Sequence, residues 1–256
     1  MQFYNKLSMN KQIPTFKEAF GILELPEYLN GLECQWLRLM QSDRDKPTII
    51  ETSRRLQDLY EEICAARFAL ITSCKLEYPE FISPNGYLWI QSQFANNAIL
   101  WYNATFDIIL QVLWIYYKLY EGLKKPLTSN NLDWILRKCE LRQFNVSIIG
   151  QETYDLLYNF REKYKPTVSE WANTLKHRRV IKYEELSKQK YRACFQQIIT
   201  KKDESILDAM KRGADCTYNS SKTLNMYKIN DVINKLFEYH KDICVLSKMI
   251  FDKIEI

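Results

Sequence analysis

Hydrophobic residues recur three or four positions apart along most of this chain, which is the spacing that places them on one face of an α-helix. In the run after Pro47, charged residues at Arg54, Asp58 and Glu62 repeat on a second face. This pattern predicts an amphipathic helix of about seven turns that ends at Pro79. Its apolar positions are Leu56, Leu59, Tyr60, Ile63, Leu70 and Cys74.

The segment from about Tyr87 to Glu121 is the most hydrophobic part of the chain, and its length alone would allow it to span a membrane. Asn103, Asp107 and Gln111 interrupt it at intervals of four residues, and an Asp in the middle of a span costs roughly 3 kcal/mol on insertion. We therefore predict a buried central helix with one polar stripe. Such a stripe is either a hydrogen-bonded seam in the core or the wall of an active-site cleft.

The same helical spacing continues to the end of the chain, with Gly and Pro residues marking the breaks between elements. No Ser- or Gly-rich linker divides the sequence, so we expect residues 1–46 to form an N-terminal appendage and residues 47–256 to form one helical domain. The predicted fold class is all-α, a helical bundle with long antiparallel helices, in which 192–227 has room for one short β-hairpin. The further helices are expected at 131–142, 152–164, 168–179 and 229–254, the last one capped by Asn230.

Composition agrees with a folded helical protein. Hydrophobic residues make up 46% of the chain, which is enough for a large core, and the six Gly and seven Pro are too few for a many-turned β architecture. The seven Cys never come closer than ten residues apart, so no zinc-ligand spacing is present and the thiols are expected to be reduced and mostly buried. The first residues lack the apolar stretch of a secretory signal, so we expect a cytoplasmic protein.

The aromatic side chains of the central helix are also predicted to lie in the core, because they belong to the most apolar helix of the chain. A surface on which nucleobases stack is the alternative. These residues are Trp89, Trp101, Trp114, Tyr116 and Tyr117.

The positive charge of the chain is concentrated in one segment. The whole chain has a formal net charge of +5, whereas residues 161–192 hold ten Lys and Arg against four Glu, a local excess of +6. This segment is either a solvated helical face near the end of the bundle or a site for an anionic partner such as RNA.

A short helix within the basic segment carries the candidate chemistry. Thr167 and Glu170 have the spacing of a capping box, which predicts where the helix begins. In that register Val168, Trp171 and Leu175 face the core, whereas Asn173 and His177 share a more polar face. The basic residues near this face are Lys176, Arg178, Arg179 and, further along the chain, Lys182.

An imidazole inside a basic patch suits phosphodiester cleavage, because it can transfer a proton near neutral pH while the neighbouring cations hold a phosphate. A solvated helix end is the plainer interpretation of His177. The second histidine, His240, lies close to the apolar stripe of the last helix and is expected to be a core or boundary residue. No phosphate loop or other cofactor motif is present, so we expect neither a cofactor nor a metal.

The run Asn173-Thr174-Leu175-Lys176-His177, with the aromatic-rich helix YNATFDIILQVLWIYYKLY upstream, resembles a divergent branch of the bacterial HEPN (higher eukaryotes and prokaryotes nucleotide-binding) group over about residues 50–255. The resemblance implies a helical bundle that forms a homodimer. It also implies a metal-independent endoribonuclease in which His177 moves a proton at the RNA 2′-hydroxyl or the leaving oxygen, Asn173 is the polar residue of the motif, and Asp107 approaches the motif helix.

The chain departs from the family pattern at one important position. The motif requires an Arg four to six residues before its His, and Trp171, Ala172 and Asn173 occupy those places. Loss of a positioned cation typically costs several kcal/mol of transition-state stabilisation. The leading hypothesis is therefore a protein that binds RNA or a partner and has weak or absent ribonuclease activity. The alternative is a purely structural or partner-binding scaffold, for instance a component of a defence or toxin module. Binding to a membrane surface is not expected, because the basic segment has no matching exposed apolar face.

Overall fold

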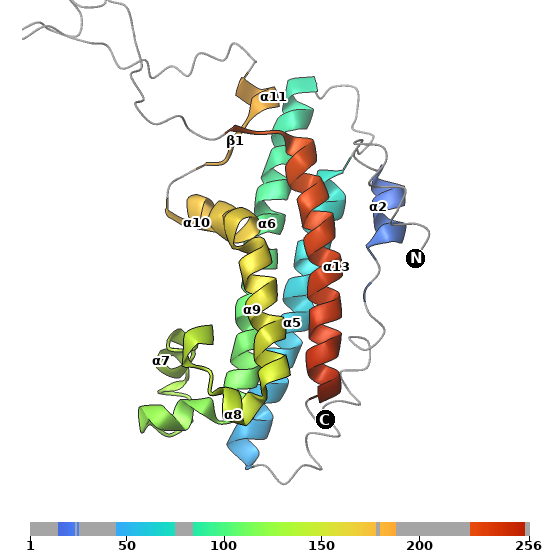
Figure 1. Ribbon diagram of the computed structural model, residues 1–256. Helices are drawn as coiled ribbons and strands as arrows, with labels where there is room; N and C mark the ends of the chain where they lie inside the picture. The colour runs from blue at the N-terminus through green and yellow to red at the C-terminus, as the bar shows by residue number, and fades with distance from the viewer. Residues whose placement is uncertain are drawn as a thin grey trace, which may run out of the picture.

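The structure, a computed structural model, describes residues 15–23, 25, 45–74, 84–177, 180–187 and 226–253. Of these described residues 83% are helical, which confirms the all-α prediction. Four long helices run up and down beside one another: α5 (Lys46–Ser73), α6 (Pro84–Tyr116), α9 (Gln151–Tyr164) and α13 (Ile229–Lys253) (Figure 1).

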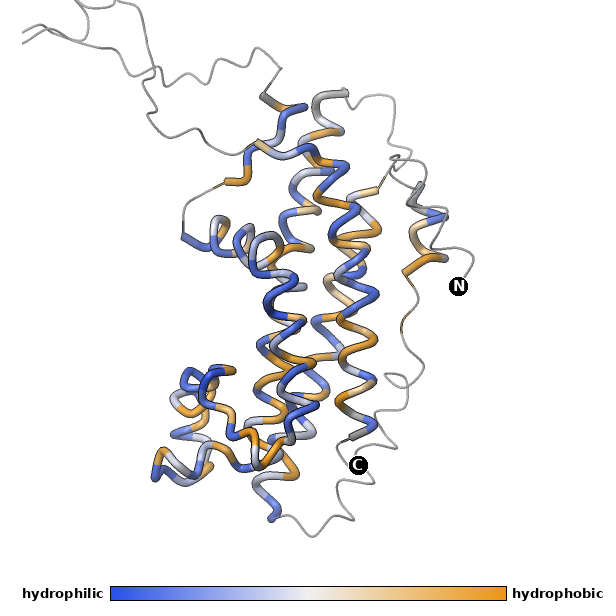
Figure 2. Tube along the Cα trace, viewed as in Figure 1, coloured by the Kyte–Doolittle hydropathy of each residue, from blue (hydrophilic) through white to orange (hydrophobic). Residues whose placement is uncertain are grey.

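Helices α5 and α6 form the antiparallel pair on which the rest of the bundle packs. The helix predicted after Pro47 is confirmed as α5, whose first turn is capped by Asp45, with Oδ1 accepting from the Thr48 backbone N–H at 3.1 Å. Its predicted apolar positions Leu56, Leu59, Ile63 and Leu70 are buried. Along α9 and α13, hydrophobic residues recur between hydrophilic ones, as expected of amphipathic helices (Figure 2).

Helix α6 is the central helix that the sequence predicted. It packs against α5, α13 and α10 (Glu170–His177). Among the described residues it is the single helix long and apolar enough to cross a membrane, and 56% of its apolar window is buried within the protein. Of its aromatic residues, Trp114 and Tyr116 are buried as predicted, but Trp89 is 58% exposed, so a core position for Trp89 was wrong.

The start of the candidate helix also differs from the prediction. Residues Lys165–Ser169 form a π-helical turn, η3, that joins α9 directly to α10. Pro166 has no N–H for a normal helical bond, and the wider turn accommodates its ring while changing the direction of the helix (Figure 1). Thr167 is inside this turn, where its Oγ1 donates to the Tyr164 carbonyl at 3.4 Å. The predicted capping box at Thr167 was therefore wrong.

Residues 119–150 form a lobe of short elements at one end of the bundle (Figure 1). The predicted helix 131–142 is broken after α7 (Leu132–Arg137), because Glu140 is extended and turns the following Leu141 into the core. Gly150 has a φ of 83°, a conformation that favours glycine, and it separates α8 from α9. The other elements of the lobe are η1 (Leu119–Leu123), η2 (Leu141–Gln143) and α8 (Val146–Ile149).

A pair of two-residue strands lies beyond α10. The strands β1 (Lys182–Tyr183) and β2 (Met226–Tyr227) pair in parallel, so residues 226–227 do not belong to the hairpin predicted for 192–227, and residues 192–225 lie outside the described part. Tyr183 fixes β1 to α6 by donating to Asn96 Oδ1 at 2.8 Å. Helix α11 (Glu184–Ser187) follows β1.

The first turn of α13 is capped from a distant part of the chain. The Ile229 N–H donates to the two carboxylate oxygens of Glu185 at 3.3 and 3.2 Å, and Asn230 lies within the helix. The predicted cap at Asn230 was therefore wrong. A negatively charged side chain suits this position because the N-terminus of a helix carries partial positive charge.

The described part of the N-terminal region packs on the bundle. Helix α2 (Phe16–Ile22) begins with a capping box between Thr15 and Glu18 and packs on α5, burying Ala19 and Leu23. Arg67 of α5 donates to the backbone carbonyls of Leu23 and Phe20, the latter at 3.2 Å. Apart from residue 25 and the start of α5 at 45–46, the rest of the predicted 1–46 appendage lies outside the described residues.

Candidate functional site

The exposed face of α10 has the side chains that the sequence predicted for it. Asn173, Lys176 and His177 are exposed, whereas Trp171 and Ala172 are buried, so the predicted helical register is correct. The ring of Trp171 meets the Tyr227 ring of β2 edge-on at 5.5 Å between centroids, which anchors the helix. The amide and the imidazole are thus one turn apart on a helix whose other face is held by the core.

Asp107 of α6 lies within electrostatic range of two cations, Lys176 and Arg161. Its carboxyl group is crowded by protein atoms although the residue reaches solvent, and this burial raises its pKa, while Lys176 of α10 and Arg161 of α9 partly offset the increase. The stacked rings of Phe106 and Phe160, 5.3 Å apart, hold α6 and α9 together at the residues that precede Asp107 and Arg161. Helix α6 packs against α10, and the charge of Lys176 acts on the Asp107 carboxyl group.

Arg161 was not among the candidate site residues, although it belongs to the basic segment. It is exposed and precedes His177 by sixteen positions on a different helix, so the spacing along the chain gave no reason to pair the two. Arg161 and Lys176 act on the same carboxyl group, that of Asp107, and the turn at Pro166 sets the direction in which α10 leaves α9 (Figure 1). An anion that binds to these two cations therefore competes with the Asp107 carboxylate.

Of the other three predicted phosphate ligands, the structure describes one. Lys182 is exposed on β1, and Arg178 and Arg179 lie outside the described residues. Ala172, which occupies a place where the family motif expects Arg, is completely buried. That position points into the core, so the cations of this face come from elsewhere in the fold.

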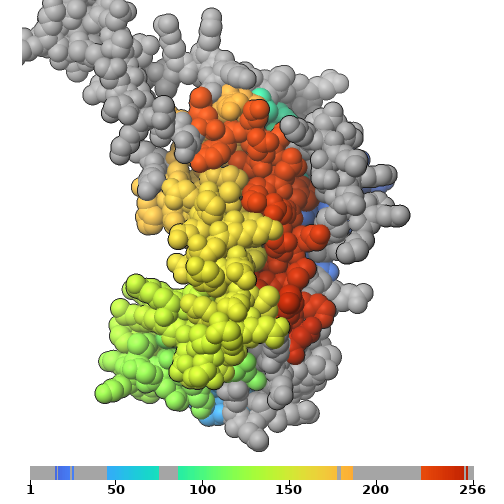
Figure 3. Space-filling view, in the orientation of Figure 1, coloured from blue at the N-terminus to red at the C-terminus, as the bar shows by residue number. Residues whose placement is uncertain are grey.

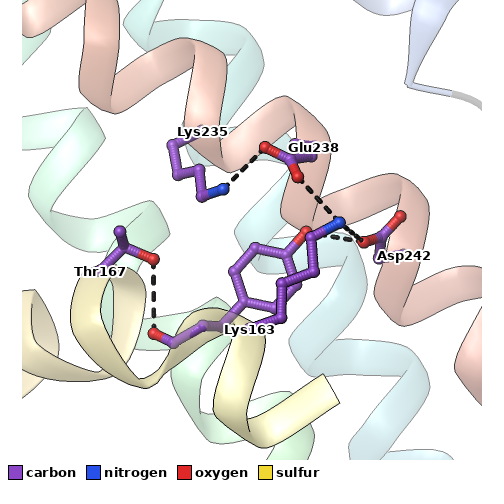
Figure 4. A network of polar contacts seen from close by, with 6 residues as sticks. Lys163, Thr167, Lys235, Glu238 and Asp242 are labelled. Carbon is purple, nitrogen blue, oxygen red and sulfur yellow. Dashed lines mark hydrogen bonds and ion pairs between the residues drawn. The ribbon is translucent and has the colours of Figure 1, made fainter. Parts of the chain in front are cut away.

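One cation of the basic segment serves a structural role. Lys163 binds Asp242 Oδ2 at 2.6 Å and Glu238 Oε1 at 2.8 Å, which ties α9 to α13 (Figure 4). Partial burial lowers the pKa of Lys163, but these two carboxylates outweigh burial and the pKa is raised. The phenol of Tyr164 donates to the same Asp242 oxygen at 2.8 Å. The described cations left on the surface of the segment are Arg161, Lys165, Lys176 and Lys182.

His240 is a core residue, as predicted. Only 2% of it is exposed, and its Nδ1 lies 2.8 Å from the phenol oxygen of Tyr102 on α6. Its Nε2 lies 3.8 Å from Cys244 Sγ, and burial raises the pKa of that thiol to about 12. The thiol is therefore protonated and unreactive at neutral pH.

Within the described ranges, no group of three or more His, Cys, Asp and Glu side chains is arranged to hold a metal ion. Comparison of the chain with protein-family models, with curated proteins and with solved structures finds no match.

Proposed function

We propose that this chain is a HEPN-like helical protein that binds RNA through the exposed face of α10, with weak or absent metal-independent ribonuclease activity. The observation that carries the proposal is the packing of α10 and α9 on α6. It brings Lys176 and Arg161 within electrostatic range of one carboxyl group, that of Asp107, on the side of α10 that exposes an amide and an imidazole. Phosphate oxygens are the ligands that such a group of cations and polar side chains favours.

Binding without efficient cleavage follows from the charges of the site. An exposed imidazole at His177 can move a proton, but a fast reaction also needs a cation aimed at the transferring phosphoryl group. The buried Ala172 supplies none, and Asp107 weakens the field of the two cations that remain. The site is therefore better suited to holding a phosphate than to stabilising additional charge in a transition state.

Fluorescence anisotropy with labelled RNA at low salt tests binding, since phosphate contacts are strongest there. We expect binding that weakens steeply as salt is added, and further weakening in Lys176→Ala and Arg161→Ala. Incubation of the same RNA in EDTA, with His177→Ala as control, tests cleavage. A wild-type protein that retains no RNA at low salt would contradict the proposal. Cleavage by the wild type that disappears in the His177 variant would show that the protein is a ribonuclease that depends on this imidazole.

The second candidate function, a partner-binding scaffold, is favoured by two exposed phenylalanines near the α2–α5 contact. Phe20 is 56% exposed beneath the Arg67 guanidinium, and Phe68 is 61% exposed. Apolar side chains of this size on a surface are common at protein interfaces. Retention of oligomeric state and partner binding in a variant that has lost all RNA binding would favour this candidate.

A homodimer in the cytoplasm belongs to the same proposal. The mass of the purified protein, measured by light scattering at several concentrations, tests the dimer directly. Fractionation of cells that express the tagged chain tests the location.

A further inference from the structure

Trp134 is an unusual residue to find on the surface of this protein. It is 41% exposed on α7, and the Nζ atoms of Lys125 and Lys138 lie 5.8 and 5.9 Å from the centroid of its ring. Its neighbour Ile135 is completely buried and holds the helix in place. An accessible indole on a rigid element with two ammonium groups beside it has the components of a nucleobase-stacking platform, namely a flat apolar surface and charges for the flanking phosphates.

The platform and the α10 face both lie within electrostatic range of Asp107. The thiol of Cys139, which follows Lys138, has a pKa raised by burial and, to a lesser extent, by the negative charge of Asp107. The end of α7 therefore lies within electrostatic reach of the same carboxyl group on which Lys176 and Arg161 act. In the space-filling view, α10 and the 119–150 lobe project from the same side of α9, and the outline of the molecule is indented between them (Figure 3).

We propose that Trp134 stacks on an unpaired nucleobase of the strand whose phosphates are held at the α10 face, so that the protein prefers single-stranded RNA. This inference rests on the proposed function and adds a second contact site to it. A base that stacks on the indole displaces one of the two lysines from the ring, and the released ammonium group can pair with a backbone phosphate. The exchange is favourable because stacking on an aromatic ring is stronger than an exposed cation–π contact.

The net charge of this part of the lobe favours the same occupant. Residues 124–142 contain five Lys and Arg against two acidic residues, Asp133 and Glu140. Glu140 is itself paired with Arg142 at 2.5 Å. A strand of RNA therefore meets an excess of positive charge on both sides of Trp134.

The test compares labelled single-stranded RNA with a fully paired duplex of the same sequence, by anisotropy at low salt and with the full chain. In Trp134→Ala we expect the affinity for the single strand to fall about tenfold, the usual effect of one stacked base, with the affinity for the duplex unchanged. Trp134→Phe retains a ring and should lose much less. Trp89→Ala is the matched control, because Trp89 is also exposed but belongs to the first turns of α6.

The possible outcomes distinguish stacking on Trp134 from RNA binding at the α10 face. Wild-type affinity in Trp134→Ala, equal losses on single strand and duplex, or an equal loss in Trp89→Ala would each overturn the stacking platform while leaving RNA binding intact. A wild-type chain that binds neither RNA would overturn both. Thermal melting of each variant shows that the fold is retained, so that a loss of affinity is assigned to the missing ring.

Discussion

The phenol oxygen of Tyr102 and the Nδ1 atom of His240 lie 2.8 Å apart in the centre of the bundle, joining α6 to α13 across 138 residues of sequence. Both side chains are buried, and the Tyr102 ring also meets the Tyr239 ring at 5.4 Å between centroids. Polar groups at this depth are stable only with a hydrogen-bond partner. The pair therefore specifies how the two helices are aligned as well as adding stability.

Removal of the phenol oxygen should weaken the fold without altering its shape. Tyr102→Phe keeps the ring but removes the buried hydrogen bond to His240 Nδ1, and we expect a loss of about 1–3 kcal/mol in the free energy of unfolding. Urea denaturation followed by circular dichroism measures it. Tyr158→Phe, at an exposed position on α9, is the control and should change stability by less than about 0.5 kcal/mol. Equal effects of the two substitutions would show that the buried bond contributes little.

The sequence was most informative where structure depends on neighbouring residues. The helix expected at 152–164 was found at Gln151–Tyr164, and the register of Asn173 and His177 was correct, because apolar spacing alone determines which face is buried. The prediction of a capping box at Thr167 was wrong because α9 continues directly into the π-helical turn. Thr167 therefore lies inside that turn and does not begin a new helix.

Long-range relationships could not be predicted in this way. Glu185 caps a helix 44 residues away, and β1 pairs in parallel with β2, a strand that is distant in the sequence. The same applies to the candidate site. The α10 residues were predicted together, whereas Arg161 of α9 was not, although it acts on the same Asp107 carboxyl group as Lys176. Trp89 was misassigned because apolar composition predicts burial of a helix as a whole. In the structure Trp89 faces solvent while its neighbour Leu88 packs against the core.

The cap on α13 should contribute measurably to stability. Glu185→Ala removes both oxygens that accept from the Ile229 N–H, and we expect a loss of about 1 kcal/mol, typical of a lost N-terminal cap. Glu185→Gln keeps one oxygen acceptor but no charge, so its loss should be smaller. Thermal melting of the two variants and the wild type gives the comparison. A Gln variant as unstable as the Ala variant would show that charge, and not the hydrogen bond, is the main contribution.

Acid should loosen the contact between α9 and α13. Partial burial raises the pKa of Glu238, but Lys163 and Lys235 outweigh burial and the pKa is lowered below its ordinary value of 4.5. A carboxyl group whose pKa is lowered by folding stabilises the native state above the ordinary value, and that contribution disappears as the pH falls through the lowered pKa. Glu238→Gln should therefore reduce the loss of stability between about pH 5 and pH 3, as measured by urea denaturation at a series of pH values. An unchanged pH dependence would mean that solvent screens this exposed pair completely.

Asp107 should limit the affinity of the α10 face for RNA. Its carboxylate competes with phosphate for Lys176 and Arg161, so Asp107→Asn should tighten RNA binding about fivefold at neutral pH, as expected for the loss of one nearby repulsive charge. Because burial raises the pKa of Asp107, the wild-type carboxyl group becomes neutral at a higher pH than an ordinary Asp. Anisotropy measured at decreasing pH should therefore show the wild type gaining affinity relative to the Asn variant until the two converge. The control is Asp231→Asn, an exposed acid in the first turn of α13. Equal gains in both variants would show that net charge alone governs binding, and a loss of affinity in Asp107→Asn would mean that the carboxylate positions the two cations.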